Sequence, residues 1–585
     1  MKQTLPFALA AVRSLTNCSK ATGLSSSATV VRILLAILLL AIHLPTMAQT
    51  PVWQSARAIA AATTTGGGGS SLVTATAIDA AGSVFLAGYF TNNVVLGSTT
   101  LTSRGSNDVF VAKFNPSTNQ FVWAQQAGGT GDDRATALAV SGTSVYVAGS
   151  FASLTATFGP AALTNMGRED VFVAKLTDAG SAGGFAWAQQ AGGTGVDQAT
   201  ALAASGTSVY VAGNLISTTA DFGTTTLSTV NGLEVFVAKL TDVGSTGSFA
   251  WVQQAGGRGI DEVKALAVSG INVYMAGSYS SMAIFGAITL TTVGSADVFV
   301  AKLTDAGSTG SFVWAQRAGG TGYDEATALA ARGNTVYIAG SFESLAANFG
   351  PATLTTVGAA DVFVAKLTDA GSAGGFVWAR RAGGTGYDVA TALALKGTGV
   401  YVAGCFYSPS ADFGTTTLTT VGSADVFVAN LTDASSMGSF EWAQLAGGIS
   451  EDRATALSVS STSIYVGGYF YSAAAAFGFI TLANPNPNRS LGFLASLPDA
   501  TPTATATGRA LVTVQLFPNP ARYTATLRLP VGTAPAPLTL TDAQGRTIRQ
   551  YPAPASTETT LDLRSLPAGL YLLRGAGIVQ RLAVE

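Results

Sequence analysis

The stretch from Trp123 to Phe151 reads WAQQAGGTGDDRATALAVSGTSVYVAGSF and contains most of a unit that recurs along the chain. Its runs ATALAV (135–140) and VYVAGSF (145–151) are apolar and are separated by Ser-Gly-Thr-Ser, a connection of hairpin length. Two later runs, DVFVAKL (170–176) and FAWAQQAGG (185–193), complete the unit. We therefore expect four antiparallel strands per unit, joined by glycine-rich turns, and no helix.

Tryptophan marks the repeat. All seven tryptophans fall at one phase of it, with a nearly constant spacing after a longer first gap: Trp53, Trp123, Trp187, Trp251, Trp314, Trp378 and Trp442. Such a long period of strand and turn signals indicates one supersecondary unit stacked on copies of itself. The strands are apolar on both faces, as expected when each sheet is packed between two others, and this accounts for the mean hydropathy of +0.38. Stacked four-stranded sheets are the blades of a β-propeller, whereas a parallel β-helix needs a shorter repeat.

Counting strands gives the number of blades. The VYVAG-type strand occurs seven times, beginning at Val84, Val145, Val209, Val273, Val336, Val400 and Ile464. The DVFVAKL-type strand also occurs seven times, the last copy being LGFLASL (491–497), but no tryptophan strand follows Leu497. We predict an all-β fold in which residues 49–497 form a seven-bladed β-propeller, closed by the N-terminal strand around Trp53, because closure removes the open sheet edges.

The first 48 residues have the pattern of a secretory signal peptide. They contain basic residues but no acidic ones, an apolar run from Ile33 to Leu44 that is too short to span a bilayer, and Thr-Met-Ala before Gln49. Cleavage removes Cys18 and the only histidine, His43, and leaves Cys405 as the one cysteine. The mature chain then has no transmembrane anchor, and it lacks the histidine needed for a Ser–His–Asp triad, a histidine-ligated zinc or a Cys–His pair.

Charge argues against nucleic acid as a partner. The formal net charge is −2, and the basic residues of the signal peptide contribute only to the unprocessed chain. No basic patch or lysine and arginine run occurs elsewhere, and such a run is what binding to a phosphate backbone needs.

The texture changes after Leu497. Residues 498–510 (PDATPTATATGRA) read as an extended Pro/Thr/Ala linker. Residues 511–585 have short alternating strands with turns at Pro518-Asn519-Pro520 and Ala543-Gln544-Gly545, a pattern typical of a small Ig-like antiparallel β-sandwich.

Four motifs in this last segment carry a resemblance to a known family. They are FPNP (517–520), LTDAQGR (540–546), LDL with LPAGLY (561–571) and QRLAV (580–584). The segment resembles the C-terminal sorting domain of the type IX (Por) secretion system of Bacteroidota. The resemblance implies contact with the type IX machinery, passage across the outer membrane, removal of the domain by a sortase-like protease, and release or attachment to the cell surface. The motif residues to which it points are Pro518, Asn519, Pro520, Asp542, Gly545, Arg546, Gly569 and Tyr571.

The tryptophan-marked units resemble the bacterial β-propeller repeats of the SBBP type, through their GGTGxDxATALAV…SVYVAG core. This resemblance covers the repetitive part of the chain, residues 49–497. It implies the propeller fold and no particular activity, because the family is defined by its repeat rather than by a reaction.

Gly-Gly-x-Gly-x-Asp recurs before the first strand of most blades, with its acids at Asp133, Asp197, Asp261, Asp324 and Asp388. Taken alone, it matches a calcium-binding nonapeptide, but copies that are a whole repeat apart leave one carboxylate per blade. We expect a glycine corner in which the aspartate accepts backbone N–H groups as in an Asx-type turn, with calcium at these positions as the alternative. We expect no other cofactor.

A second acid opens the DVFVAK strand, with a lysine five residues later, as in Asp108 and Lys113. Recurrence in nearly every copy favours an ion pair within or between blades over chemistry. The tryptophans are expected to be core anchors rather than a sugar-binding platform. Adjacent acids such as Asp132 and Asp133 point to opposite faces of a strand, which disfavours an acid–base pair for glycoside hydrolysis.

Variation between copies indicates where a ligand binds. The loops between the second and third strands differ (FASLTAT, NLISTTA, YSSMAIF, FESLAAN, FYSPSAD, FYSAAAA) and share a rim with the glycine corners. The expected contact residues on this rim are Tyr323, Tyr387, Tyr407, Tyr471, Arg168 and Arg258.

The sequence thus predicts a non-enzymatic binding or adhesion module, exported to the cell surface or medium, with an extracellular protein or glycan as ligand. The alternative is a carbohydrate-active or calcium-dependent secreted enzyme that uses only Asp and Glu.

Overall fold

The computed structural model describes residues 50–61, 68–229, 232–499, 515–529, 537–542, 546–554, 556, 558–575 and 578–585. The chain divides into two compact units, residues 1–501 and 502–585. All regular elements of the described ranges are β-strands, and none of these ranges contains a helix long and apolar enough to cross a membrane. The signal peptide expected at 1–48 and most of the linker expected at 498–510 lie outside the described residues.

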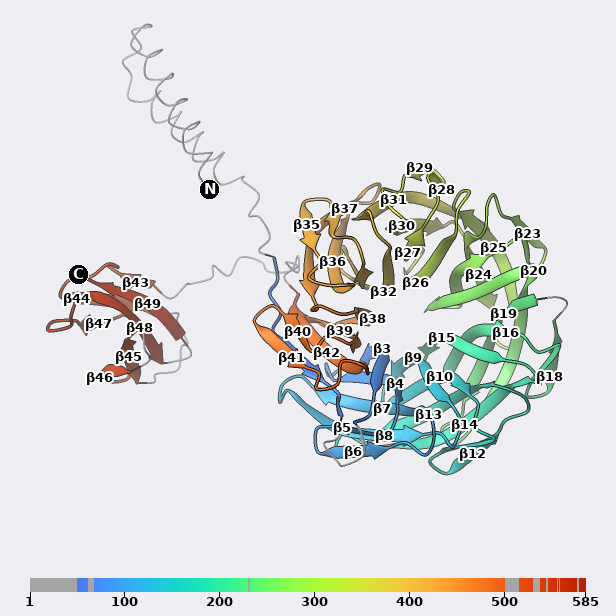
Figure 1. Cartoon of the computed structure of the whole chain (residues 1–585), viewed down its shortest axis with the longest axis horizontal. Helices are drawn as coiled ribbons and strands as arrows, with labels where there is room; N and C mark the ends of the chain where they lie inside the picture. The colour runs from blue at the N-terminus through green and yellow to red at the C-terminus, as the bar shows by residue number, and fades with distance from the viewer. Residues whose placement is uncertain are drawn as a thin grey trace, which may run out of the picture. The chain divides into compact units, whose positions relative to one another are not determined.

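The first unit is a ring of seven four-stranded antiparallel sheets, here called blades A to G, with each first strand toward the centre (Figure 1). Blade A consists of β3 (Ser71–Ile78), β4 (Val84–Phe90), β7 (Asp108–Asn115) and β8 (Gln120–Ala127); blade B of β9 (Asp133–Ser141), β10 (Ser144–Phe151), β13 (Asp170–Asp178) and β14 (Gly183–Gly193). Blade C consists of β15 (Asp197–Ser205), β16 (Ser208–Leu215), β19 (Gly232–Asp242) and the first half of β20 (Gly247–Ser269), whose second half begins blade D with β21 (Asn272–Tyr279), β24 (Asp297–Asp305) and β25 (Gly310–Ala318). Blade E consists of β26 (Asp324–Arg332), β27 (Thr335–Phe342), β30 (Asp361–Asp369) and β31 (Gly374–Gly384); blade F of β32 (Asp388–Lys396), β33 (Gly399–Phe406), β36 (Asp425–Asp433) and β37 (Gly438–Ala446); blade G of β38 (Asp452–Val459), β39 (Ser463–Phe470), β42 (Leu491–Pro498) and β1 (Ser55–Ala58). The predicted all-β fold with a seven-bladed propeller is confirmed.

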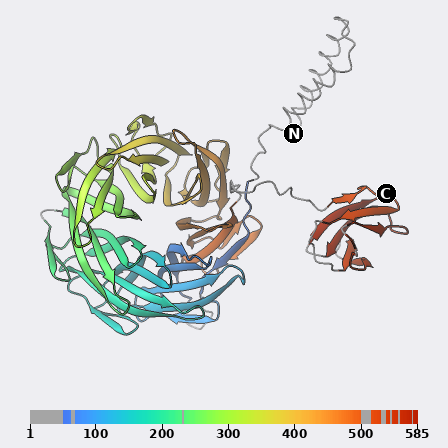
Figure 2. The ribbon, with the colours of Figure 1, turned by 180° about the vertical axis from the view of Figure 1, so that it is seen from behind.

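Each repeat carries two strands more than the sequence pattern predicts. The segment between the second and third strands is a short hairpin at the periphery of the ring, visible from both sides (Figures 1 and 2). The hairpins are β5 (Asn93–Leu96) with β6 (Thr99–Thr102), β11 (Thr155–Phe158) with β12 (Ala161–Thr164), β17 (Thr219–Phe222) with β18 (Thr225–Ser228), β22 (Met282–Phe285) with β23 (Ile288–Thr291), β28 (Ala347–Phe349) with β29 (Ala352–Leu354), β34 (Ser410–Phe413) with β35 (Thr416–Thr419), and β40 (Ala474–Phe477) with β41 (Ile480–Ala483); β2 (Ala60–Ala61) adds to β5.

Burial of one phenylalanine explains why these segments are ordered. Phe158 packs against Phe172 and Phe185 of the third and fourth strands, with ring centroids 4.7 and 5.7 Å apart. Four-residue strands are too short to show a clear alternation of apolar and polar residues in the sequence. The prediction that these segments are loops was therefore wrong for the residues of the hairpin strands, such as Thr155–Phe158 and Ala161–Thr164 in blade B.

A threonine near the start of the first strand links neighbouring blades at the centre of the ring. Thr136 Oγ1 donates to the carbonyl oxygen of Ala199 in the next blade at 2.7 Å. The same bond recurs from Thr74, Thr200, Thr327, Thr391 and Thr455. In blade D the equivalent position is occupied by Lys264, so this row of threonines around the centre of the ring is interrupted by one charged residue.

The last blade is completed by the N-terminal strand. β1 pairs antiparallel with β42, with Arg57 opposite Leu494, so segments far apart in sequence close the ring (Figure 1). Its register is displaced relative to the other blades. Trp187 lies opposite Lys175 in blade B, but in blade G the corresponding place, opposite Ser496, is taken by Ser55.

Trp53 therefore takes a different position from the other six tryptophans. Its ring packs edge-on against Phe477 with centroids 5.1 Å apart, as Phe185 packs against Phe158 in blade B. Its Nε1 donates to the carbonyl oxygen of Leu445 at 2.9 Å. The prediction of a single phase for all seven tryptophans was wrong for Trp53, and the longer gap between Trp53 and Trp123 is its sign in the sequence.

The second unit is a small β-sandwich. One sheet has the order β43 (Gln515–Phe517), β44 (Thr524–Arg528), β47 (Glu558–Asp562), and the other has the order β46 (Thr547–Tyr551), β45 (Leu538–Asp542), β48 (Gly569–Gly575), β49 (Ile578–Val584). Leu527, Leu540, Leu573 and Leu582 are fully buried between the sheets. Alternation of these leucines with exposed residues is the pattern that predicts the sandwich.

Candidate binding face and sorting domain

Buried ion pairs join the blades on the face that carries the turns between third and fourth strands. Asp242 in blade C accepts hydrogen bonds from Lys175 Nζ at 2.5 Å, Tyr146 Oη at 2.7 Å and Trp187 Nε1 at 3.1 Å, all in blade B. At three later junctions, an aspartate likewise accepts hydrogen bonds from a lysine, a tyrosine and a tryptophan of the preceding blade: Asp305, Asp369 and Asp433. Asp178 accepts hydrogen bonds from Lys113 and Trp123. Burial alone would raise the pKa of Asp242, but the bonds from Lys175 and Tyr146 lower it below its ordinary value.

These contacts correct one prediction and support another. The lysine of the DVFVAK strand does form an ion pair between blades, but its partner is the aspartate of the next blade's turn, not the aspartate that opens its own strand. The lysine points away from that strand-opening acid, which lies at the other end of the same strand. The tryptophans are buried core anchors whose indole N–H groups are satisfied inside the ring.

The Gly-Gly-x-Gly-x-Asp aspartates lie on the opposite face and are also buried. Asp133 Oδ2 accepts hydrogen bonds from Gly129 N at 2.7 Å and Ser153 Oγ at 2.6 Å, while Oδ1 accepts Ser153 N at 3.1 Å. Asp197, Asp324 and Asp388 make the same contacts with Ser217, Ser344 and Ser408, and Asp261 accepts Gly257 N. The donors lie four residues before and twenty residues after the aspartate, rather than two residues after it as in an Asx turn. Among the described residues, no group of three or more His, Cys, Asp or Glu is placed to hold a metal ion.

The strand-opening acids lie beside these corner acids, with a glycine between them. A methyl group added to Gly128, whose φ is 139°, would lie 2.7 Å from Asp108 Oδ1 and 2.8 Å from Asp133 Oδ2. The first glycine of the motif is thus required because two carboxylates occupy the place of a side chain. Burial, followed by the nearby charge of Asp133, raises the pKa of Asp108 to about 6. Burial likewise raises the pKa of Asp170 and Asp425 to about 6.

These raised pKa values predict that the propeller is more stable at pH 5 than at pH 7.5. Between the ordinary carboxyl pKa and about 6, the folded state binds protons at Asp108, Asp170 and Asp425 that the unfolded chain does not. Stability therefore rises as the pH falls through 6. The acids with lowered pKa, such as Asp242, lose their contribution only below their ordinary range, so they do not oppose the trend in this window.

Urea denaturation at several pH values measures this effect, and Asp425→Asn is the matched variant. An amide at this position carries no charge and can still accept the bond from Val421 N, which is 2.6 Å from Asp425 Oδ2. We expect the variant to be at least as stable as the native chain at pH 7.5 and to gain less on acidification. A stability that falls steadily from pH 7.5 to pH 5 would contradict the prediction.

Three of the predicted rim tyrosines belong to one continuous cluster on the corner face. Tyr387 and Tyr407 meet edge to face with centroids 6.3 Å apart, and the Arg453 guanidinium lies 5.5 Å from the centre of the Tyr407 ring and donates to its hydroxyl. Arg453 also pairs with Glu451 at 2.6 Å. Tyr471 continues the cluster in blade G through an edge-to-face contact with Tyr469 at 5.8 Å.

A further tyrosine–arginine pair lies beyond the closing seam, in blades A and B. The Arg134 guanidinium lies 5.2 Å from the centre of the Tyr89 ring. Arg134 in turn pairs with Asp132 at 2.5 Å. We call this set the tyrosine belt: Tyr89, Asp132, Arg134, Tyr387, Tyr407, Glu451, Arg453, Tyr469 and Tyr471. Sequence reasoning missed Tyr89, Tyr469, Arg134 and Arg453 because they lie within strands that recur in every blade, where only the residue type distinguishes these copies.

The remaining predicted rim residues lie outside the belt. Tyr323 sits beside Glu325 in blade E, and Glu325 and Glu262 flank Lys264 at 3.5 and 3.0 Å. The Arg168 and Arg258 side chains are exposed and make no hydrogen bond or ion pair within the described part of the chain.

The same face exposes a ring of aliphatic side chains. Leu154 and Leu345 are 75% and 78% exposed at the start of the connections that lead into the hairpins. Val293, Val357, Val421, Ile216, Ile260 and Ile449 are also exposed at the connections and corners of this face. On the opposite face, Val243, Ile271 and Met437 are exposed at turns between strands. Exposed apolar groups gathered on one face are typical of an interaction surface.

In the sandwich, the motif residues hold turns and strand ends. The Asn519 amide bridges to the last strand, donating to the carbonyl oxygen of Arg581 at 2.7 Å and accepting Ala583 N at 2.8 Å. Pro518 and Pro520 flank it in the same turn. Asp542 pairs with Arg546 at 2.7 Å, and Gly545 lies outside the described residues. Tyr571, six per cent exposed, donates to the carbonyl oxygen of Pro567 at 2.8 Å, and Gly569 begins the same strand.

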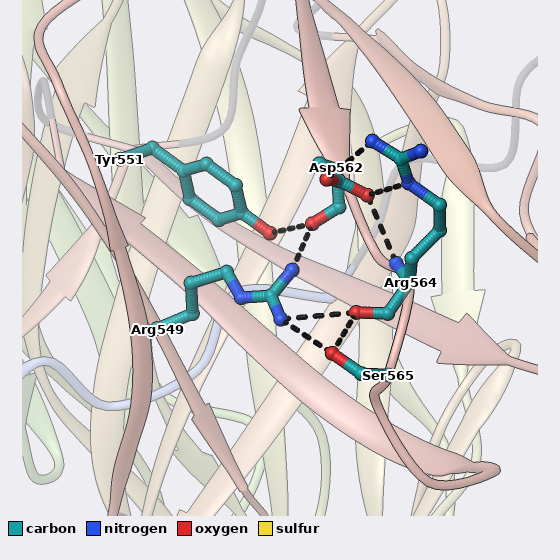
Figure 3. Close-up of polar contacts among 5 residues, drawn as sticks. All are labelled: Arg549, Tyr551, Asp562, Arg564 and Ser565. Atoms are coloured by element: carbon teal, nitrogen blue, oxygen red, sulfur yellow. Dashed lines mark hydrogen bonds and ion pairs between the residues drawn. The ribbon is translucent and has the colours of Figure 1, made fainter.

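A second polar cluster, which the sequence analysis did not identify, fixes the turn after β47 (Figure 3). Arg549 donates to the carbonyl oxygens of Asp562 at 2.6 Å and Arg564 at 3.0 Å, and Tyr551 Oη donates to Asp562 O at 2.7 Å. The Arg564 guanidinium donates a hydrogen bond to the Asp562 carboxylate at 3.0 Å and lowers the pKa of Asp562 to about 2. The LDLRS stretch (561–565) is therefore a defined turn held from the neighbouring sheet.

The strand order defines a β-propeller followed in the chain by a small β-sandwich. Comparison with known families supplies the particular identity of the sandwich: residues 515–578 match the model described as secretion system C-terminal sorting domain. The predicted type IX (Por) sorting domain is thus confirmed, and the protein is exported by type IX secretion to the cell surface or medium.

For the whole chain, one solved structure illustrates the similarity found. Drosophila Semaphorin 2a is similar in structure, with 6% sequence identity, 92% of this chain and 98% of that chain covered, and a TM-score of 0.26. No curated protein matches the chain.

Proposed function

We propose that the protein is a non-enzymatic binding or adhesion module of the SBBP repeat type, which uses the face of the tyrosine belt to bind an extracellular protein or glycan. The proposal includes a cleaved N-terminal signal peptide and removal of the sorting domain after export. The observation that carries it is the belt itself, a run of tyrosine and arginine side chains that occurs in only some blades of an otherwise repetitive ring.

The composition of this face supports binding over packing. Tyrosine and arginine are enriched at interfaces because they combine a large contact area with a polar end group. Tyr387 is 39% exposed although it sits beside Tyr407, so its ring offers a free edge to a ligand. The surrounding aliphatic ring extends the contact area and favours a ligand larger than a single small molecule.

The test is a binding screen with variants of both faces. Labelled protein is applied to a glycan array and to immobilised extracellular proteins, and the affinity of any ligand found is measured. The double variant Tyr387→Ala/Tyr471→Ala removes two aromatic anchors and is expected to weaken binding at least tenfold, about the effect of losing one hot-spot residue. Both residues lie at the surface, so the fold should remain intact.

The matched control is Val243→Ala/Met437→Ala, which truncates two exposed side chains on the opposite face. It should leave the affinity unchanged. Product analysis of each glycan hit separates binding from hydrolysis. Equal loss of affinity in both double variants, or turnover of a bound glycan, would overturn the proposal.

A further inference from the structure

One of the seven blade junctions lacks the buried anchor that fills the others. Between blades G and A, the lysine position is Ser496, which lies opposite Tyr465 as Lys175 lies opposite Tyr146. The tryptophan position is Ser55, because of the displaced register of β1. The aspartate position, three residues after the lysine of the strand, is Pro116 in blade A. Of the four anchor groups, only the tyrosine remains.

The loss of an indole, a lysine and a carboxylate leaves a cavity of about 400 Å³ at this junction, here called the seam pocket. Its walls include all four positions, Ser55, Ser496, Pro116 and Tyr465, together with Phe114 and Asn119. The remaining lining residues are Ser, Thr and Gln side chains from the adjoining strands and turns. The volume is within the roughly 300–1,000 Å³ typical of small-molecule sites.

The chemistry of the walls is neutral and rich in hydroxyl groups. Ser55 Oγ and Ser496 Oγ share a hydrogen bond at 2.7 Å, and none of the described residues that line the pocket is charged. Arg57 lies at its edge and donates to Asn119 Oδ1 at 3.3 Å. At five other junctions the corresponding tyrosine hydroxyl donates to a buried aspartate of the next blade, but the lining of the seam pocket contains no carboxylate. Within the lining of the seam pocket, the hydroxyl of Tyr465 therefore has the Ser463 hydroxyl as its hydrogen-bond partner and meets no carboxylate.

We infer that the seam pocket binds one neutral sugar residue through the hydroxyl and amide groups that line it. Neutral walls favour an uncharged polyol over a sugar acid, since a buried carboxylate would find no cation inside the pocket. A dense set of short hydroxyl and amide side chains matches the alternating donors and acceptors of a pyranose. The site would give the ring one sugar-binding position, where sevenfold repetition is broken.

This inference is independent of the proposed binding face. The seam pocket is built from the turn between the third and fourth strands of blade A and the turn between the first and second strands of blade G. In an antiparallel blade these turns lie on the face opposite the corners that carry the tyrosine belt. Variants of the tyrosine belt therefore test only the proposed binding face, and variants of the seam pocket test only the sugar site.

The experiment is saturation-transfer NMR on the full-length protein with the methyl glycosides of glucose, galactose, mannose and N-acetylglucosamine as probes. Glucuronic acid is the charged comparator, and N-acetyltryptophanamide represents the indole that fills the other junctions. We expect at least one neutral glycoside to bind and glucuronic acid not to bind. Tyr471→Ala, in the belt, should leave this binding unchanged.

Two kinds of variant assign the signal to the pocket. Ser55→Trp restores the indole and should abolish binding without lowering the thermal midpoint. Ser496→Lys fills the same space and is used in its place if Ser55→Trp fails to fold. Tyr465→Phe should weaken binding about fivefold, the effect of one lost hydrogen bond. Tyr274→Phe removes the same hydroxyl at a filled junction and should have no effect on binding.

The possible results divide clearly. A neutral glycoside signal that is lost in the filled pocket and weakened in Tyr465→Phe supports the inference. No signal from any glycoside, a signal that persists in folded Ser55→Trp, or binding of the indole probe alone would overturn it.

Discussion

Replacement of Asp369 by alanine is expected to destabilise the propeller by about 3–5 kcal/mol, because it leaves a buried lysine without its partner charge. Asp369 accepts Lys302 Nζ at 2.7 Å and also takes the hydroxyl of Tyr274 at 2.7 Å and the indole N–H of Trp314 at 3.0 Å. The side chains of Lys302 and Asp369 are only 5% and 2% exposed. Urea denaturation of the variant and the native chain measures the change in the free energy of unfolding.

An exposed ion pair provides the control. Arg134 and Asp132 lie 2.5 Å apart, but their side chains are 45% and 37% exposed. Asp132→Ala should therefore cost no more than about 1 kcal/mol. The double replacement Lys302→Met/Asp369→Leu should recover part of the stability lost in Asp369→Ala, since it removes both buried charges but leaves the Tyr274 hydroxyl and the Trp314 indole N–H without their acceptor. Equal effects of the two alanine variants would show that burial of the anchor contributes nothing.

The second large effect concerns export. Leu573→Asp is expected to abolish delivery of the protein to the cell surface and medium, because it places a charge in the core of the sorting domain. Leu573 is fully buried between the two sheets, and an unpaired carboxylate there unfolds a domain of this size. The measurement is the amount of propeller in the medium, on the surface and in the periplasm of a host with type IX secretion.

Leu570→Asp is the matched control, since Leu570 lies on the same strand and is 53% exposed. It should leave export intact. A complementary test joins the signal peptide and residues 511–585 to a reporter, which should then appear outside the cell. Export of Leu573→Asp at the native level, or retention of the reporter in the periplasm, would contradict a sorting role for the folded domain.

The sequence predicted the repetitive part of this molecule well. Apolar runs of six to nine residues between glycine turns identified the strands of the blades, and their count agreed with the seven sheets. The FPNP and LPAGLY motifs identified the sorting domain. These features were predictable because each is encoded locally, by residues within a few positions of one another.

Contacts between distant residues were not predictable in the same way. The lysine of the DVFVAK strand was assigned to the wrong acid, because its true partner lies a whole repeat further along the chain, across a blade junction, as in Lys113 and Asp178. The rim hairpins depend on burial of a single phenylalanine against two others, as for Phe158. A four-residue strand is too short for its sequence pattern to predict such burial.

The sequence by itself thus determined the class of fold, the presence of a sorting domain and the residue types available for chemistry, since periodicity and composition are properties of the chain. Only the tertiary structure decided which differences between copies of the repeat create a distinct surface or pocket. The tyrosine belt forms because blades F, G, A and B become neighbours on closure of the ring. The seam pocket forms because β1 pairs with β42 in a register that places Ser55, not Trp53, opposite Ser496. Register and ring closure depend on packing between residues from the two ends of the propeller sequence, which no local pattern encodes.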